Sequence, residues 1–140
     1  MNRRCPEHKF IGLGILRGWR WFINRRGDAS LVRSPGDLVY GAVYDISPSD
    51  EATLDECEEV PHKYTKHVVG IELQPNNNEE EGYVIQSLAY IDEERKEEGE
   101  PREEYVYRIN MGIKDAAARG LPKWYVGKYI RRFIPVGEGM

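Results

Sequence analysis

Four carboxylates occupy five consecutive positions in the segment LDECEEV, residues 54–60. The segment falls where a helix is expected to end, and the backbone dipole carries partial negative charge at that end. Neighbouring acids, the dipole and burial all disfavour an ionised carboxylate and so raise its pKa. A carboxylate tuned in this way is a better general base near neutral pH than an ordinary surface acid. The segment therefore indicates either a solvated acidic rim or a residue that accepts a proton.

Helical spacing singles out one of these four acids. Residues four apart lie on the same face of a helix, so Glu58 shares a face with Leu54, which is expected to point at the core. Asp55, Glu56 and Glu59 are expected to project elsewhere. Glu58 is therefore the acid that the pattern predicts to be partly buried.

Other reactive side chains suggest weaker alternatives. Cys57 beside His62 and His67 could form a thiol–imidazole pair, but no orienting motif accompanies them, and Cys57 is expected to face the core as a small hydrophobe. Adding His8 to the two other histidines does not give the spacing of metal ligands. With two cysteines and no CxxC or HExxH motif, the sequence predicts no metal site.

Composition narrows the class of protein. The chain has 140 residues, the size of one domain, and we expect a single domain over residues 1–140. Its net charge of −4 argues against a nucleic-acid surface, although the aromatic run at residues 19–22 could stack on single-stranded bases. No apolar run approaches a membrane helix of about 20 residues, and residues 1–10 show no secretory signal. We therefore expect a reduced, cytoplasmic protein that binds neither nucleic acid nor membrane.

Strands are expected to come first in the chain. Apolar or alternating runs predict strands over residues 10–16, 19–24, 29–32, 38–46, 64–73 and 83–91. Arg17-Gly18 is interpreted as a break, and SPGD at residues 34–37 as a tight turn between two strands. The charge-rich residues 92–104 are expected to form a solvated loop.

Helices are expected mainly in the last third. A short helix is predicted from SPSD at residues 47–50, which offers a capping serine, a first-turn proline and a capping-box acid, to about residue 58. Residues 105–119 have helical spacing before Gly120, and Pro122 opens a last helix whose core face is expected to hold Trp124, Tyr125 and Tyr129. Strands followed by helices predict an α+β fold, with the strands curled into a barrel or a strongly bent sheet.

The order of these motifs resembles the gamma-glutamylcyclotransferase family, which has the AIG2-like fold, and its fungal-type members in particular. The family pattern is Ser-Pro-x-Asp, a Val-x-Gly-x-x-Tyr strand, a second Ser-Pro-x-Asp that opens a short helix, and Leu-Asp-x-x-Glu-Gly-Val. The matching segments are SPGD at 34–37, VYGAVY at 39–44, SPSD at 47–50 and LDECEEV at 54–60. Residues 107–130, YRINMGIKDAAARGLPKWYVGKYI, are similar to the family's closing Gly-Ala-x-x-x-Gly-Leu-Pro segment.

The resemblance implies a site and a reaction. In the family the glutamate of Leu-Asp-x-x-Glu is the general base, a role that carries over to Glu58, and Tyr64 resembles a tyrosine that lines the substrate pocket. The implied reaction releases 5-oxoproline from glutathione or another gamma-glutamyl compound or conjugate, with no metal and no organic cofactor. The implied α+β fold is a small mixed β-barrel with a short helix that carries the acid and with C-terminal helices.

The sequence departs from the family pattern at two places. Glu59 stands where the family has glycine. Family members also open with a strand that ends in a Tyr-Gly-Ser-Asn-type loop, which cradles the α-carboxylate of the substrate, and the sequence from Met1 onward contains no counterpart. The protein therefore either starts upstream or is a shortened member with an incomplete pocket, in which case the uncovered sheet edge favours pairing into a homodimer.

Two hypotheses of function follow from the resemblance. The first is a lyase of glutathione metabolism, or of a fungal specialised-metabolite pathway, whose partner is a small gamma-glutamyl substrate. The alternative is a catalytically impaired family member that acts as a binding or scaffold protein. Turnover of a gamma-glutamyl compound distinguishes the two.

Overall fold

The computed structural model describes residues 8–57, 60, 64–74 and 82–136. Two long strands come first, β1 (Lys9–Ile23) and β2 (Ala29–Asp45), and helix α1 (Pro48–Cys57) follows them. Strands β3 (Thr65–Leu73) and β4 (Tyr83–Ile91) come next. The C-terminal part holds α2 (Glu103–Ala118), the short α3 (Lys123–Tyr125) and the π-helical turn η1 (Val126–Ile130). This order of elements confirms the predicted α+β class.

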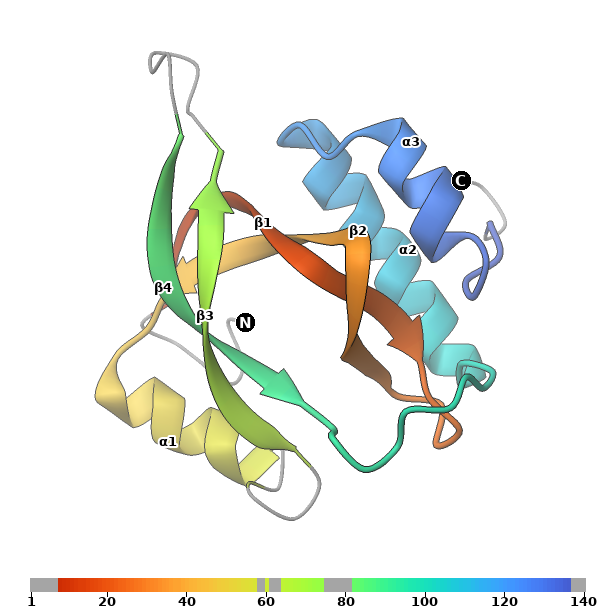
Figure 1. The fold of residues 1–140 in the computed structure, drawn as a ribbon, viewed down its shortest axis with the longest axis horizontal. Helices are drawn as coiled ribbons and strands as arrows, with labels where there is room; N and C mark the ends of the chain where they lie inside the picture. Colours follow the sequence, from red (N-terminus) through yellow and green to blue (C-terminus); the bar gives the residue numbers. More distant parts are fainter. Residues whose placement is uncertain (1–7, 58–59, 61–63, 75–81, 137–140) are drawn as a thin grey trace.

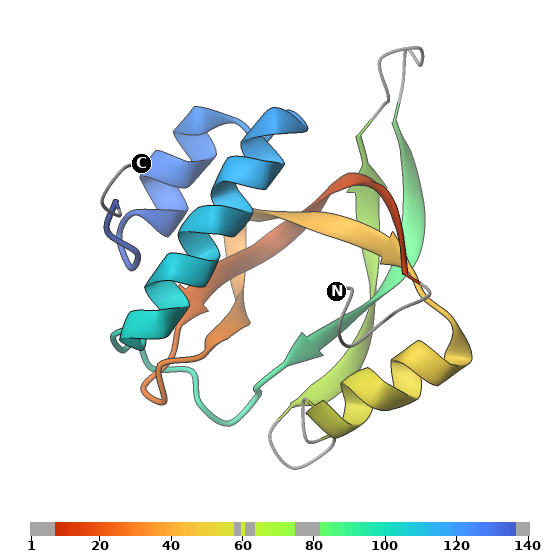
Figure 2. The ribbon, with the colours of Figure 1, turned by 180° about the vertical axis from the view of Figure 1, so that it is seen from behind.

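The four strands form one antiparallel sheet in the order β2-β1-β3-β4. β1 and β2 pair along most of their length, whereas β1 meets β3 only at Gly14–Leu73 and Ile15–Glu72. This narrow junction lets the β3–β4 pair cross the β1–β2 pair, as Figure 1 shows, so the sheet is strongly bent. Helix α1 lies at one end of the molecule, and α2 and α3 lie together at the opposite end, in both views (Figures 1 and 2).

The predicted break at Arg17-Gly18 and the predicted tight turn at residues 34–37 are wrong, because both segments lie inside continuous strands. Arg17 pairs with Leu38 and Trp19 with Arg33, so the SPGD segment bulges out opposite Gly18. Gly18 and Gly36 have φ angles of 84° and 89°, a region that favours glycine. The turn residues therefore form a bulge that bends β2 instead of ending it.

The charge-rich segment after β4 is fastened to β1 and β2 by hydrogen bonds, so the prediction of a solvated loop over residues 92–104 is only partly right. Asp92 is 1% exposed, and its backbone N–H donates to the Ser30 hydroxyl at 3.0 Å. The Gly99 N–H donates to the carbonyl of Ile23 at 2.8 Å. Composition shows the charges of this segment but not the partners that it finds on β1 and β2.

The C-terminal elements pack on β1 and β2 and close a buried apolar cluster. Its fully buried members are Ile23, Tyr125, Tyr129, Ile130 and Ile134. Trp124, expected in this core, is instead 54% exposed. Tyr125 is followed by buried residues four and five positions later, and Ile134 follows this pair by the same two intervals, which suits a chain that passes through a π-helical turn. Trp124 precedes this stripe. No helix within the described ranges is long and apolar enough to span a membrane.

The narrow β1–β3 junction predicts a sharp response to substitution of Gly14. A Cβ added at Gly14 would lie 2.3 Å from Cγ2 of Ile71 and 3.0 Å from Cγ2 of Val43. Gly14→Ala is therefore expected to lower the free energy of unfolding by about 1–3 kcal/mol through overpacking, measured by urea denaturation. Gly41→Ala is the matched control, because Gly41 pairs with Gly14 across β1–β2 and an added Cβ meets nothing within 4 Å. Equal stability of the two variants would contradict this account of the junction.

Candidate functional site

Helix α1 begins as its sequence predicts. The Ser47 hydroxyl accepts a hydrogen bond from the Asp50 backbone N–H at 3.1 Å, and the Ser47 carbonyl accepts one from the Glu51 N–H at 2.9 Å. Pro48 occupies the first helical position, where its missing N–H costs nothing. The Asp50 side chain is buried, at 2% exposure. These contacts fix the direction in which α1 leaves the end of β2.

An ionic network holds α1 against the sheet. The ammonium group of Lys66, on β3, lies 2.7 Å from Oε2 of Glu51 and 2.9 Å from Oδ2 of Asp55. The hydroxyl of Tyr90, on β4, donates to Oδ1 of Asp55 at 2.8 Å. Lys66 and Tyr90 are register partners in β3–β4, and Glu51 and Asp55 are four residues apart on one face of α1. A pair of neighbouring sheet residues, Lys66 and Tyr90, thus contacts a pair of acids on one face of α1.

This network corrects two expectations about α1. Asp55, expected to project away, faces the sheet with a side chain that is 31% exposed. Cys57, expected to face the core, is exposed. The reason is that α1 docks through paired charges, which turn the Glu51–Asp55 face toward Lys66. Leu54 is half-buried beside that face.

The network is charged at neutral pH. Hydrogen bonds from Lys66 and then Tyr90 lower the pKa of Asp55 below its usual value. Hydrogen bonds to Glu51 and then Asp55 raise the pKa of the Lys66 ammonium group. Each shift favours the ionised form, so the carboxylate and the ammonium stabilise each other.

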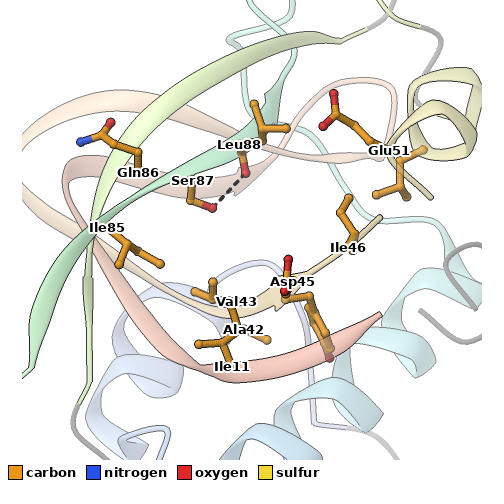
Figure 3. A pocket seen from close by; sticks show the side chains of 12 residues that line it. Ile11, Ala42, Val43, Asp45, Ile46, Glu51, Ile85, Gln86, Ser87 and Leu88 are labelled. Atoms are coloured by element: carbon orange, nitrogen blue, oxygen red, sulfur yellow. Dashed lines mark hydrogen bonds between the residues drawn. The ribbon is translucent and has the colours of Figure 1, made fainter. Parts of the chain in front are cut away.

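A cavity of about 400 Å³ opens beside α1. Its walls come from the end of β2, from α1, from the middle of β4 and from Ile11 of β1, as the close-up in Figure 3 shows. The apolar lining residues include Ile11, Val43, Ile46, Leu54, Ile85 and Leu88. The polar ones are Tyr44, Asp45, Glu51, Gln86 and Ser87. The cavity therefore offers apolar walls and the carboxylate of Asp45, while the Glu51 carboxylate at its wall is paired with Lys66.

Of the two residues predicted for the site, the structure describes only Tyr64. Glu58 lies outside the described residues and stays a prediction. Tyr64 is described: it is 6% exposed, and its hydroxyl donates to the Ala29 carbonyl at 3.0 Å. Tyr64 is not among the residues that line the cavity beside α1, and its role in substrate binding also stays a prediction.

The backbone between these two positions is fixed at one point. The Val60 N–H donates to the carbonyl of Asp55 at 3.0 Å. This hydrogen bond joins Val60 to the last turn of α1. It ties the exit from α1 to the same residue that holds Lys66 and Tyr90.

Sequence reasoning did not find Asp45, Glu51, Lys66, Gln86 or Tyr90 as site residues. The spacing of Glu51 and Asp55 on one helix face was a visible signal of a shared partner. Lys66 and Tyr90 could be matched to them only through the β3–β4 register, which the sequence does not state.

The histidines serve local contacts. Nε2 of His67 lies 2.8 Å from Oε1 of Glu93, and the His8 ring packs edge-on against Tyr44 with centroids 5.5 Å apart. His62 lies outside the described residues. Among the residues that the structure describes, no group of three or more His, Cys, Asp or Glu side chains could hold a metal ion.

Comparisons with known proteins agree on one family and one fold. The model of the AIG2-like family matches residues 38–129, which include the second part of β2, all of α1 and the cavity wall on β4. A solved structure described as gamma-glutamyl cyclotransferase is 26% identical, with a TM-score of 0.77, and the match covers 98% of this chain and 80% of that chain. The human protein loc79017, described as uncharacterized, is 27% identical, with a TM-score of 0.76 over 99% of this chain and 82% of that one.

A structure of At5g39720.1 from Arabidopsis thaliana, 19% identical with a TM-score of 0.51, covers 85% of this chain and 80% of that chain, and shares the fold. No curated protein matches the chain.

The Lys66–Asp55 pair predicts an acid-sensitive contribution to stability. The folded pKa of Asp55 lies below the ordinary 3.8, so the pair stabilises the fold above that pH and loses its effect as the pH falls through the folded pKa. Lys66→Gln is expected to raise the pKa of Asp55, measured by ¹³C NMR titration of its carboxyl carbon. Tyr90→Phe should raise it by less.

Lys114→Gln is the control, because it removes an exposed charge on α2 far from the network. A pKa of Asp55 that does not move in Lys66→Gln would show that the lysine does not hold the carboxylate in solution.

Proposed function

Since the chain belongs to the AIG2-like family, we propose that it is a gamma-glutamylcyclotransferase, a lyase that releases 5-oxoproline from glutathione or another gamma-glutamyl compound. The observation that carries the proposal is the cavity beside α1, in a fold that matches a gamma-glutamyl cyclotransferase over nearly the whole chain. Leu54 lines this cavity, and Glu58 follows Leu54 by four residues in the sequence. The proposal assigns the role of general base to Glu58.

The proposed reaction needs one base and one folded-back substrate. Glu58 takes a proton from the α-ammonium group of the gamma-glutamyl residue, and the freed amine attacks the γ-carbonyl carbon of the same residue. A new C–N bond closes the five-membered ring, the original amide C–N bond breaks, and the departing nitrogen takes the proton held by Glu58. The ring nitrogen releases its second proton to Glu58, which passes it to the departing amine, so the products are 5-oxoproline and an ammonium group and Glu58 is again a carboxylate. Because nucleophile and electrophile belong to one residue, holding the cyclic conformer supplies much of the acceleration.

The described residues support this chemistry through binding and positioning. The carboxylate of Asp45 attracts the ammonium group of the substrate into the cavity. The Lys66 contacts to Glu51 and Asp55 fix the helix that leads to Glu58. Apolar residues on β1, β2 and β4 exclude water from the side of the cavity that faces the sheet.

The proposal predicts turnover that depends on a single carboxylate. The wild-type chain is expected to release 5-oxoproline from glutathione or a gamma-glutamyl amino acid, measured by liquid chromatography with mass spectrometry. Glu58→Gln should lower kcat/KM by roughly 10²–10⁴-fold, the usual contribution of a general base. Glu59→Gln is the matched control, since it removes the same charge one position later, and it should retain activity within about threefold.

Two outcomes would overturn parts of the proposal. Turnover that survives in Glu58→Gln would show that Glu58 is not the general base, while the assignment of the lyase reaction would stand. A folded chain that releases no 5-oxoproline from glutathione, gamma-glutamyl amino acids or a glutathione conjugate would favour the binding or scaffold alternative.

A further inference from the structure

A second cavity, of about 300 Å³, lies between the β1–β2 pair and the C-terminal segment. It shares no lining residue with the cavity beside α1. Its charged lining residues are Arg20, Asp37, Glu98, Lys128 and Arg132, and three aromatic rings complete the wall. Three cations and two carboxylates leave one positive charge on the lining.

The contacts inside the cavity show which ligand chemistry it accepts. Nη2 of Arg132 lies 2.7 Å from each carboxylate oxygen of Glu98, and Nη1 of Arg20 lies 3.1 Å from Oε1 of the same residue. Two guanidinium groups therefore converge on one carboxylate, and each uses a single nitrogen for it. A guanidinium carries five N–H donors, so both arginines keep donors for a second oxyanion.

Lys128 is the cation least committed to the protein. Its ammonium group lies over the Tyr129 ring, with Nζ 5.2 Å from the centroid. No carboxylate in the described part of the chain forms an ion pair with it. Asp37, an acid on the lining, already accepts hydrogen bonds from the hydroxyls of Ser34 and Tyr129, the latter at 2.6 Å. These bonds and the charge of Lys128 lower the pKa of Asp37.

Two backbone irregularities build this cavity. Asp37 ends the bulge in β2, and Lys128 and Tyr129 belong to the π-helical turn η1. Bulges and π-helical turns interrupt regular pairing and are frequent at functional sites, because they re-aim side chains. The Tyr129–Asp37 hydrogen bond joins the two irregular segments.

The apolar wall of the cavity is aromatic. Trp21 and Phe133 pack edge to face with centroids 5.9 Å apart. Arg132 lies over the Phe133 ring, with Cζ 5.2 Å from its centroid. A flat group on a ligand could therefore contact rings while its anionic group meets the cations.

We propose that this cavity binds a small organic anion, a carboxylate or a phosphate monoester attached to a flat ring. The anionic oxygens bind Lys128 and the unused donors of Arg20 and Arg132, and the ring packs against Trp21 and Phe133. The net positive charge of the lining favours a negatively charged ligand. The cavity volume, at the lower end of the roughly 300–1,000 Å³ of ligand pockets, limits the ligand to a small one.

Benzoate, phenyl phosphate and inorganic phosphate are the probes, titrated into the full chain and followed by ¹H–¹⁵N NMR. The two ring-bearing probes are expected to shift the Trp21 indole signal and the Phe133 amide saturably, and inorganic phosphate should bind at least about tenfold more weakly than phenyl phosphate because it lacks the ring contact. Comparing benzoate with phenyl phosphate tells which anionic group the site prefers. The measurement needs no turnover, so its result is independent of the proposed lyase activity.

Lys128→Gln is expected to weaken phenyl phosphate binding by about tenfold, because it removes a charge-assisted contact. Lys123→Gln is the matched control, since Lys123 is exposed on the neighbouring α3 and does not line the cavity. Equal weakening in both variants would overturn the proposal. So would the absence of a saturable shift at Trp21 up to about 10 mM probe, because the dissociation constant would then lie above the millimolar range. Binding of inorganic phosphate as tightly as phenyl phosphate would overturn the ring contact.

Discussion

The contact of Lys66 with Glu51 and Asp55 is the constraint on which the candidate site depends. Helix α1 is rich in acids and poor in apolar residues, so burial of side chains alone would hold it weakly. Lys66 instead draws two carboxylates of one helix face onto β3, and Tyr90 adds a hydrogen bond from β4. The helix thereby covers the end of the bent sheet, and the cavity forms between them.

Much of the fold could be predicted from the sequence, because local patterns decide it. The start of α1 at Ser47, the bounds of β4 and the stop of α2 before Gly120 all rest on capping, alternation or glycine chemistry, and the structure has them there. The division of β1 and β2 into shorter strands was wrong, since turn residues were taken to end a strand. Opposite a long partner strand the same residues form a bulge, and only the pairing register reveals the partner.

The candidate site was less predictable, because its contacts join segments far apart in the sequence. Helical spacing predicted that Leu54 points at the core, and the structure has it half-buried at the cavity; spacing also predicted Asp55 to project away and Cys57 to face the core, and both predictions were wrong. Both errors share a cause. Helical spacing predicts that the apolar side of α1 faces inward, but Lys66, fifteen residues after Glu51, binds the acidic side and turns that side toward the sheet. A charge pattern on one helix does not say where its counter-charge lies in the fold.

The net charge of −4 conceals two cavities of opposite character. The cavity beside α1 is lined by the carboxylates of Asp45 and Glu51, while the one beside η1 is lined by two arginines and a lysine against two acids. The two linings therefore favour ligands of different charge. The residues that line a cavity affect ligand binding more strongly than the net charge of the chain does, because charges beyond a Debye length of about 8–10 Å are screened. Strand β2 reaches both cavities, with Asp37 at one and Asp45 at the other. Between these two residues β2 pairs with β1 in regular register from Leu38 to Val43, and the register shifts before Tyr44, so the strand is a paired connection between the two cavities except at that shift.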